Sequence, residues 1–133
     1  MSFEAVRKLE SVLGAALPSD YRVFLTTHTT EYLEPPLLVR HLVQVPGSGP
    51  EDVVTSLYTA TSIIESELLG EPEEGMVIIG QVEPGGYLYM CFKASDFGSV
   101  YVRFPYQDST FYPVGKSFSV FMARCRPDPE SDA

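Results

Sequence analysis

Apolar positions recur at intervals of three and four residues in four segments, which is the spacing that places them on one side of a helix. The first two predicted helices span residues 3–13 and about 18–28, and Pro18 suits the first turn of the second because that position needs no backbone N–H. Two further helices are predicted over residues 59–69 and 116–125. The chain therefore opens with a helical pair and closes with a helix.

Between these helices the pattern is typical of β-strands. In one segment Val39, His41, Val43 and Val45 would share one face of a strand, and the others are short apolar runs bounded by Gly, Pro, Ser and Asp. The predicted strands, in chain order, are residues 37–45, 76–80, 87–92, 100–104 and 110–113. Residues 53–58 fit either a short strand or the beginning of the third helix. The last predicted strand contains Pro113 and is expected at a sheet edge, where a missing N–H is tolerated.

These elements predict an α+β fold. Its antiparallel β-meander sheet would have two N-terminal helices, one central helix and one C-terminal helix packed mostly on one face, because strands joined by tight turns run antiparallel. The other face of such a sheet meets solvent or a partner. A chain of 133 residues fits one domain, which we place at residues 1–126, and residues 127–133 are predicted to be an acidic disordered tail.

The charge of the chain is strongly negative and unevenly distributed. Eighteen Asp and Glu residues against nine Lys and Arg residues give a formal net charge of −9, and no basic residue lies between Arg40 and Lys93. Such a surface repels phosphate backbones and acidic lipids, so we expect neither nucleic acid nor a membrane as a partner. The acidity then serves either solubility alone or the attraction of a basic partner.

If the acidity attracts a basic partner, the carboxylates of the acidic segment and of the turns that follow it are the candidate contacts. These partner-binding candidates are Glu51, Asp52, Glu65, Glu67, Glu71, Glu73, Glu74, Glu83, Asp96 and Asp108. Tyrosines are enriched among the residues that dominate binding energy at protein interfaces. The candidate tyrosine anchors are Tyr87, Tyr89, Tyr101 and Tyr106.

Residue patterns that carry catalysis or bind cofactors are not found in the sequence. His28 and His41 are isolated, and neither has a second ligand type at metal-binding spacing or belongs to a recognisable nucleophile motif. Cys91 and Cys125 occur singly and far apart, which predicts free thiols. We therefore predict a protein that is not an enzyme and needs no cofactor or metal.

The beginning of the chain lacks the basic and apolar regions of a secretory signal. No stretch approaches the ~18–20 apolar residues that cross a bilayer. We expect the protein to remain in the cytoplasm.

The order of four motifs resembles that of the SUKH superfamily, which includes the fungal cell-wall-synthesis regulator domain and many bacterial toxin-immunity proteins. The first motif, Leu9–Leu25, reads Leu-Glu-x-x-Leu-Gly-x-x-Leu-Pro-x-Asp-Tyr-Arg-x-Phe-Leu. An apolar strand, glycine and hairpin follow at residues 76–88, then Gly-x-Val-Tyr at 98–101 and Lys-Ser-Phe-Ser-Val-Phe-Met at 116–122. The chain departs from the family pattern in lacking tryptophan and in carrying His-Thr-Thr-Glu at 28–31, where a turn such as Asn-Gly is usual.

This resemblance implies an α+β domain without enzymatic activity. In bacterial members such a domain binds and neutralises a cognate toxin domain, often a nuclease, and the acidic surface fits a basic toxin. We hypothesise that the open sheet face and the acidic loops occlude the toxin. A regulatory or scaffolding domain on the same fold is the alternative, and an unrecognised enzyme or small-molecule binder is a third possibility. The oligomeric state stays open.

Overall fold

A computed structural model of the protein describes residues 3–43, 51–65, 70–71, 75–83, 85–104 and 110–127. Its helices are α1 (Phe3–Leu13), α2 (Ser19–Thr27), α3 (Ala60–Glu65) and α4 (Phe118–Arg124), with a short 3₁₀ helix at Ala94–Asp96. Its strands are β1 (Tyr32–Arg40), β2 (Glu51–Leu57), β3 (Gly70–Glu71), β4 (Met76–Glu83), β5 (Gly86–Cys91), β6 (Val100–Arg103), β7 (Tyr112–Gly115) and β8 (Cys125–Pro127).

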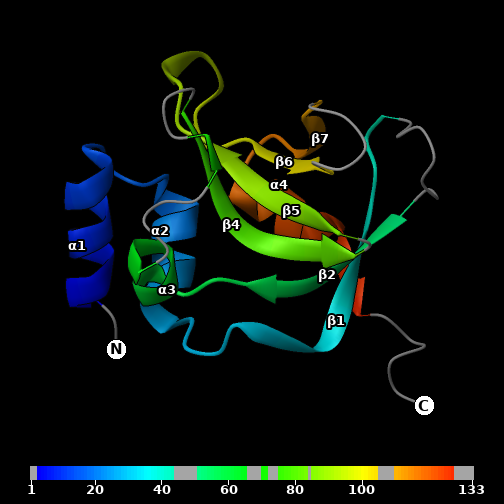
Figure 1. The fold of residues 1–133 in the computed structure, drawn as a ribbon, viewed down its shortest axis with the longest axis horizontal. Coiled ribbons are helices and arrows are strands. Elements are labelled where there is room, and N and C mark those ends of the chain that lie inside the picture. The colour runs from blue at the N-terminus through cyan, green and yellow to red at the C-terminus, as the bar shows by residue number, and fades with distance from the viewer. Residues whose placement is uncertain are drawn as a thin grey trace.

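The described strands form one curled antiparallel sheet (Figure 1). Their order across the sheet is β7-β6-β5-β4-β2-β1-β8, and β3 pairs with β4 beside this path. The run from β4 to β7 consists of consecutive antiparallel neighbours, as a meander requires. The predicted α+β class with an antiparallel meander is therefore confirmed, and the last strand of the meander, β7, lies at the sheet edge as expected.

The first strand begins earlier than its sequence pattern indicates. β1 starts at Tyr32 and passes through Pro35 and Pro36, although we expected the strand to start at Leu37. The prolines are tolerated because the pairing of β1 with β2 is interrupted between Tyr32 and Leu37, so no ladder hydrogen bond is lost there. At its other end β1 stops at Arg40, which leaves His41 just outside the strand in which it was predicted.

Two further segments refine the sequence prediction. The ambiguous residues 53–58 are a strand as far as Leu57, and α3 begins at Ala60, while residues 66–69 of the predicted helix lie outside the described part of the chain. The strand β8 was missed, since three residues carry no readable pattern and exist as a strand through pairing with β1. Pro127 therefore belongs to the sheet, and residues 128–133 of the expected tail are not described.

The main core lies between the helices and one face of the sheet. Each helix contributes two buried apolar residues to it: Val6 and Leu9 from α1, Tyr21 and Leu25 from α2, Ala60 and Ile63 from α3, and Phe118 and Phe121 from α4. The inward residues of the central strands include Val77, Leu88, Met90, Val100 and Val102. In Figure 1, α4 lies behind the strands β4 and β5. A smaller apolar cluster on the opposite face consists of Met76, Ile78, Tyr89 and Cys91, and no described helix contributes a buried residue to it.

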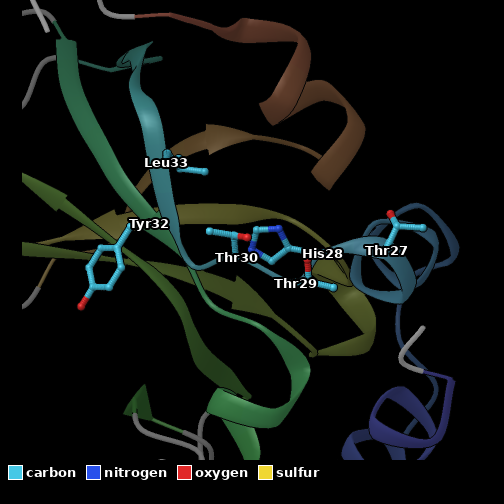
Figure 2. Close-up of a pocket in the computed structure, with 6 residues that line it drawn as sticks. All are labelled: Thr27, His28, Thr29, Thr30, Tyr32 and Leu33. Carbon is cyan, nitrogen blue, oxygen red and sulfur yellow. The ribbon is translucent and has the colours of Figure 1, made fainter.

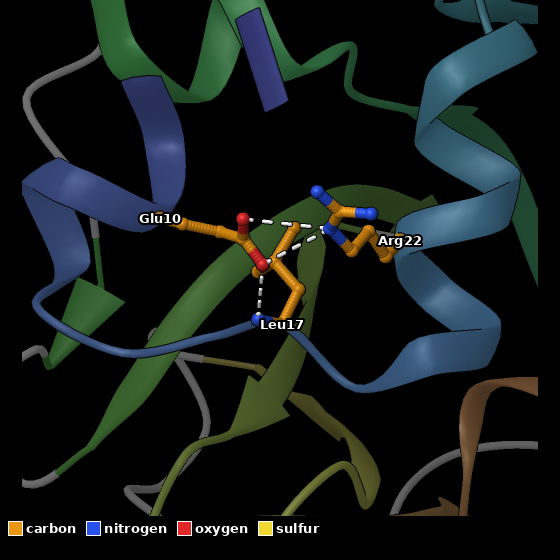
Figure 3. Close-up of polar contacts among 3 residues, drawn as sticks. All are labelled: Glu10, Leu17 and Arg22. Atoms are coloured by element: carbon orange, nitrogen blue, oxygen red, sulfur yellow. Dashed lines mark hydrogen bonds and ion pairs between the residues drawn. The ribbon is translucent and has the colours of Figure 1, made fainter. Parts of the chain in front are cut away.

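Glu10, near the end of α1, fixes the connection to α2 (Figure 3). The backbone N–H of Leu17 donates to its Oε2 at 2.8 Å, and the Nε of Arg22 donates to the same oxygen at 3.3 Å. Gly14, with φ of +73°, ends α1 in the left-handed conformation that glycine adopts without strain. The polar residues of the opening motif are thus occupied in holding two helices together.

Asp20, at the start of α2, holds α2 and α4 together through side-chain hydrogen bonds. Its Oδ2 accepts hydrogen bonds from the backbone N–H and the hydroxyl of Ser119, at 2.8 and 2.9 Å. Ser117, the N-cap residue of α4, accepts from the N–H of Val120 at 3.1 Å. Two of the N–H groups that every helix leaves unpaired in its first turn are therefore satisfied, one of them by a residue 99 positions away.

We expect Asp20→Ala to lower the free energy of unfolding by about 1–2 kcal/mol, because it removes a cap that also joins two helices. Urea denaturation of the purified protein measures the change. Ser119→Ala is the matched control, since it removes one hydroxyl and leaves the backbone N–H bonded to Asp20. It should cost clearly less than Asp20→Ala, and equal losses would contradict a capping role for Asp20.

Candidate partner-binding face

The sheet face opposite the helices carries a row of polar and aromatic side chains. In the strand register, Tyr32 lies opposite Ser56, Ser56 opposite Gln81, Gln81 opposite Tyr87, and Tyr87 opposite Arg103. Directly paired residues of antiparallel strands project from the same face. These five residues therefore form a cross-strand row over β1, β2, β4, β5 and β6, and we call the face that bears it the open face.

A second layer of aromatic residues supports this row. Tyr89 pairs with Tyr101, and both rings meet the ring of Phe111 edge-on, at centroid distances of 4.9 and 6.3 Å. The guanidinium of Arg103 lies 4.7 Å from the centre of the Phe111 ring. Tyr89 is 3% exposed, so its predicted role as an exposed anchor is wrong. Tyr87 and Tyr101 are half-buried and remain candidates, and Tyr106 lies outside the described residues.

A hollow of about 310 Å³ opens at the β5–β6 end of this face. It is lined by Met76, Cys91, Lys93, Ser95, Asp96, Tyr101 and Phe111. Asp96 accepts hydrogen bonds from the hydroxyls of Ser99, at 2.6 Å, and of Tyr101. Burial raises the pKa of Tyr101 to about 12, and the bond to Asp96 adds to the effect. The Asp96 carboxylate is thus engaged within the chain.

A larger hollow, about 590 Å³, lies where α2 leads into β1 (Figure 2). Its lining consists of Thr27, His28, Thr29, Thr30, Tyr32 and Leu33. The Nε2 of His28 lies 2.5 Å from the carbonyl oxygen of Leu57, and its ring stacks on Phe24 at 4.5 Å. His28 is therefore held in a structural contact. Figure 2 shows Tyr32 and Leu33 on opposite sides of β1, with Tyr32 directed to the open face.

The structure brings some of the predicted carboxylates to the open face and leaves others elsewhere. Glu83, exposed at the end of β4, and Glu51, at the start of β2, lie on this face, and Glu51 pairs with Arg126 at 2.9 Å. Glu65 is exposed at the end of α3, away from the sheet, and Glu71 pairs with Met76 in β3. Glu67, Glu73, Glu74 and Asp108 fall outside the described residues.

Asp52 occupies a core position and is 1% exposed. Its Oδ2 lies 2.5 Å from the Nε2 of His41, whose side chain is 4% exposed. Burial raises the pKa of Asp52, and the hydrogen bond to His41 opposes the rise. Because β2 directs this side chain to the helix side beside Val39, it cannot contact a partner while the strand pairing is intact.

The residues that charge counting missed are Glu31, Tyr32 and Tyr58. Tyr32 is 72% exposed at the start of β1. The pKa of Tyr58 is raised to about 12, first by burial and then by Tyr87, Glu31 and Tyr32, which lie near it. Strand alternation beginning at Tyr32 was the available signal, but Pro35 and Pro36 concealed it.

Residues 3–43, 51–65, 70–71, 75–83, 85–104 and 110–127 contain no group of three or more His, Cys, Asp or Glu placed to hold a metal ion. Both cysteines are free thiols, with Cys91 buried, and burial raises the pKa of Cys125 to about 12. Within the same residues, no helix has the length and apolar content to span a membrane.

A curled antiparallel sheet with α-helices on one side and a tyrosine-bearing open face defines an α+β domain. The sequence matches the SMI1 / KNR4 family (SUKH-1) over residues 1–124, and the chain belongs to this family. The family is known in immunity proteins and related regulators that bind other proteins, and it is generally non-catalytic. No curated protein and no solved structure matches the chain.

The raised pKa values of Tyr58 and Tyr101 predict a loss of stability in alkali. Their pKa is about 12 in the folded protein against an ordinary value of 10.0, so the protonated form is favoured by folding. The resulting stability is fully present below the unfolded pKa and is lost as the pH rises through the folded pKa. Tyr21, whose pKa burial also raises, contributes with the same sign.

We therefore expect the free energy of unfolding to fall as the pH rises from the ordinary tyrosine pKa of 10.0 towards about 12. Denaturant unfolding at a series of pH values measures it, with tyrosinate absorbance recorded in parallel. Tyr101→Phe should show a shallower fall over this interval, because one titrating group is gone. A flat profile for the wild-type protein would contradict the assigned burial of these hydroxyls.

Proposed function

We propose that this chain binds a cognate cationic toxin domain, for example a nuclease, and neutralises it by covering its active cleft or nucleic-acid-binding surface. The observation that carries the proposal is the cross-strand row on a sheet face to which no described helix contributes a buried residue. Family membership supports it, since the family is known in immunity proteins. Residues 1–126 would form the binding domain.

Tyrosine on a strand is well suited to such binding. Its ring supplies a large contact area while only two side-chain torsions are restricted, and its hydroxyl remains compatible with water before the partner arrives. The strands hold Tyr32 and Tyr87 at fixed positions, so little ordering is required on association. A preformed, water-tolerant surface of this kind favours occlusion of a partner as a rigid body.

Electrostatics would supply speed and selectivity. The net charge of −9 attracts a basic protein and repels nucleic acid and acidic membranes, which we propose are not partners. Toxins that cleave nucleic acid need a basic surface to bind their substrate. The same surface would meet the exposed Glu83 on the open face. On this proposal the chain acts in the cytoplasm, performs no catalysis and requires no cofactor.

A regulatory or scaffolding domain is the second candidate, because the family is also known in regulators. It would use the same face for cellular partners. The two functions differ in outcome, since an immunity protein rescues cells from one toxin and a scaffold does not.

The test is co-expression with any toxin encoded beside this gene, combined with capture of that toxin by the tagged protein. We expect stoichiometric capture and rescue of growth. Recovery of several housekeeping proteins without rescue would favour the regulatory function, and absence of both capture and rescue for the neighbouring toxin would contradict the immunity proposal.

Charge reversal at two exposed carboxylates locates the binding face. Glu83→Lys, on the open face, should weaken toxin capture about tenfold or more and reduce its dependence on salt, because a repulsive charge replaces an attractive one. Glu65→Lys, at the end of α3, makes the same chemical change away from the sheet and should leave capture unchanged. Isothermal titration at two salt concentrations measures both. Loss with Glu65→Lys alone would move the interface to the helices.

A further inference from the structure

The hollow of about 310 Å³ at the β5–β6 end of the open face has an apolar base. Met76 and Cys91, which lie opposite each other in β4 and β5, are both buried and belong to its lining. Tyr101 and Phe111 line it as well, and their rings meet edge-on at a centroid distance of 6.3 Å. The hollow therefore offers apolar contact to a group of side-chain size.

The turn that supplies the polar part of the lining is held in one conformation. The backbone N–H of Asp96 donates to the carbonyl oxygen of Lys93 at 3.0 Å, and that of Ser99 donates to the carbonyl oxygen of Asp96 at 3.2 Å. The hydroxyl of Ser99 donates to the Oδ1 of Asp96 at 2.6 Å, and the hydroxyl of Tyr101 donates to its Oδ2. The polar groups are thus positioned before any ligand arrives, which lowers the cost of binding one.

Two opposite charges, Lys93 and Asp96, line this hollow without pairing with each other. Neither takes part in an ion pair among the described residues. The stem of Lys93 lies against Gly75, where a Cβ atom would come within 2.9 Å of the lysine Cγ. Asp96 is bonded only to neutral hydroxyls, and a carboxylate accepts about four hydrogen bonds, so it can still bind a cation.

We propose that this hollow binds a free α-amino acid with an apolar side chain, such as phenylalanine. The carboxylate of the ligand would pair with Lys93 and its ammonium group with Asp96. Its side chain would rest on Met76, Tyr101 and Phe111. The ammonium and carboxylate of an α-amino acid are attached to one carbon atom, so a single small ligand can satisfy both charges of the lining.

The charges of the chain favour a zwitterion over other ligands of this size. A net charge of −9 disfavours an anion and leaves a ligand without net charge unaffected. A purely apolar ligand would displace water from Lys93 and Asp96 and give them no partner. Ligand sites usually measure about 300–1,000 Å³, and this hollow lies at the small end, as suits one amino acid. The inference does not depend on the proposed function.

The experiment titrates the full chain with L-phenylalanine at pH 7 and follows binding by calorimetry and by NMR of the isotope-labelled protein. We expect saturable shifts at Lys93, Asp96 and Tyr101 and a dissociation constant of about 0.1–1 mM. N-acetyl-L-phenylalanine lacks the ammonium group, L-phenylalaninamide lacks the carboxylate, and glycine lacks the side chain. Each should bind at least about tenfold more weakly, because each leaves one part of the hollow unmatched.

The same comparison distinguishes a free amino acid from the end of a peptide. The N-acetyl derivative imitates a C-terminal residue, and the amide imitates an N-terminal one. Equal binding of either derivative and of L-phenylalanine would overturn the inference in favour of a site for a peptide terminus. Absence of saturable binding by phenylalanine, leucine and methionine would overturn it outright.

Two variants with equal loss of charge test the role of Lys93. Lys93→Gln should weaken binding of L-phenylalanine about tenfold and should not weaken binding of L-phenylalaninamide, which has no carboxylate to lose a partner. Lys116→Gln is the matched control, since Lys116 is exposed outside the lining, and it should change neither affinity. Urea denaturation of each variant shows that the fold is retained. Equal losses for both ligands in Lys93→Gln, or equal effects of the two variants, would contradict the site.

Discussion

The packing of the four described α-helices against one face of the sheet is the constraint on which the remaining features depend. Each of the four described helices is too short to be stable alone and gains its stability by burying apolar residues on the strands. Contacts between distant helix ends, such as Asp20 with Ser119, hold that layer in place. No described α-helix contributes a buried residue to the opposite face, so the side chains at the margin of its small apolar cluster must tolerate water and still cover the sheet. Tyrosine satisfies both requirements, with an apolar ring and a polar end.

The bulges in the sheet determine which side chains reach the open face. Between Val54 and Ser56 the register shifts against β4, so Val54 faces the helices while Ser56 joins the cross-strand row. Without that shift the period-two alternation would direct both residues to the same side. Gly80 allows β2 and β4 to approach closely beside this bulge, because a Cβ there would lie 2.4 Å from the carbonyl oxygen of Ser56. The row therefore depends on backbone irregularities as much as on strand pairing.

This dependence explains how far the sequence could predict the structure. Helical spacing in α1 and α4 and the turns of the meander are local signals, and they were sufficient for the fold class. β8 and the first residues of β1 form through pairing with distant strands, which leaves no local pattern. The bulges leave none either, so the cross-strand row could not be assembled from the sequence. Charge counting selected carboxylates without knowing that Asp52 is buried.

Internal pairing further reduces the number of carboxylates available to a partner. Glu51 is paired with Arg126 and Glu10 with Arg22, so their charge is largely used within the fold, and the oxygens of Asp96 are bonded to Ser99 and Tyr101. These carboxylates still contribute to the long-range field, which depends on net charge and accelerates encounter. Short-range affinity requires groups without an internal partner, and among the described residues the Oε1 of Glu31 is one. Attraction at a distance and binding in contact would thus be carried by different residues, which is why net acidity alone does not locate the site.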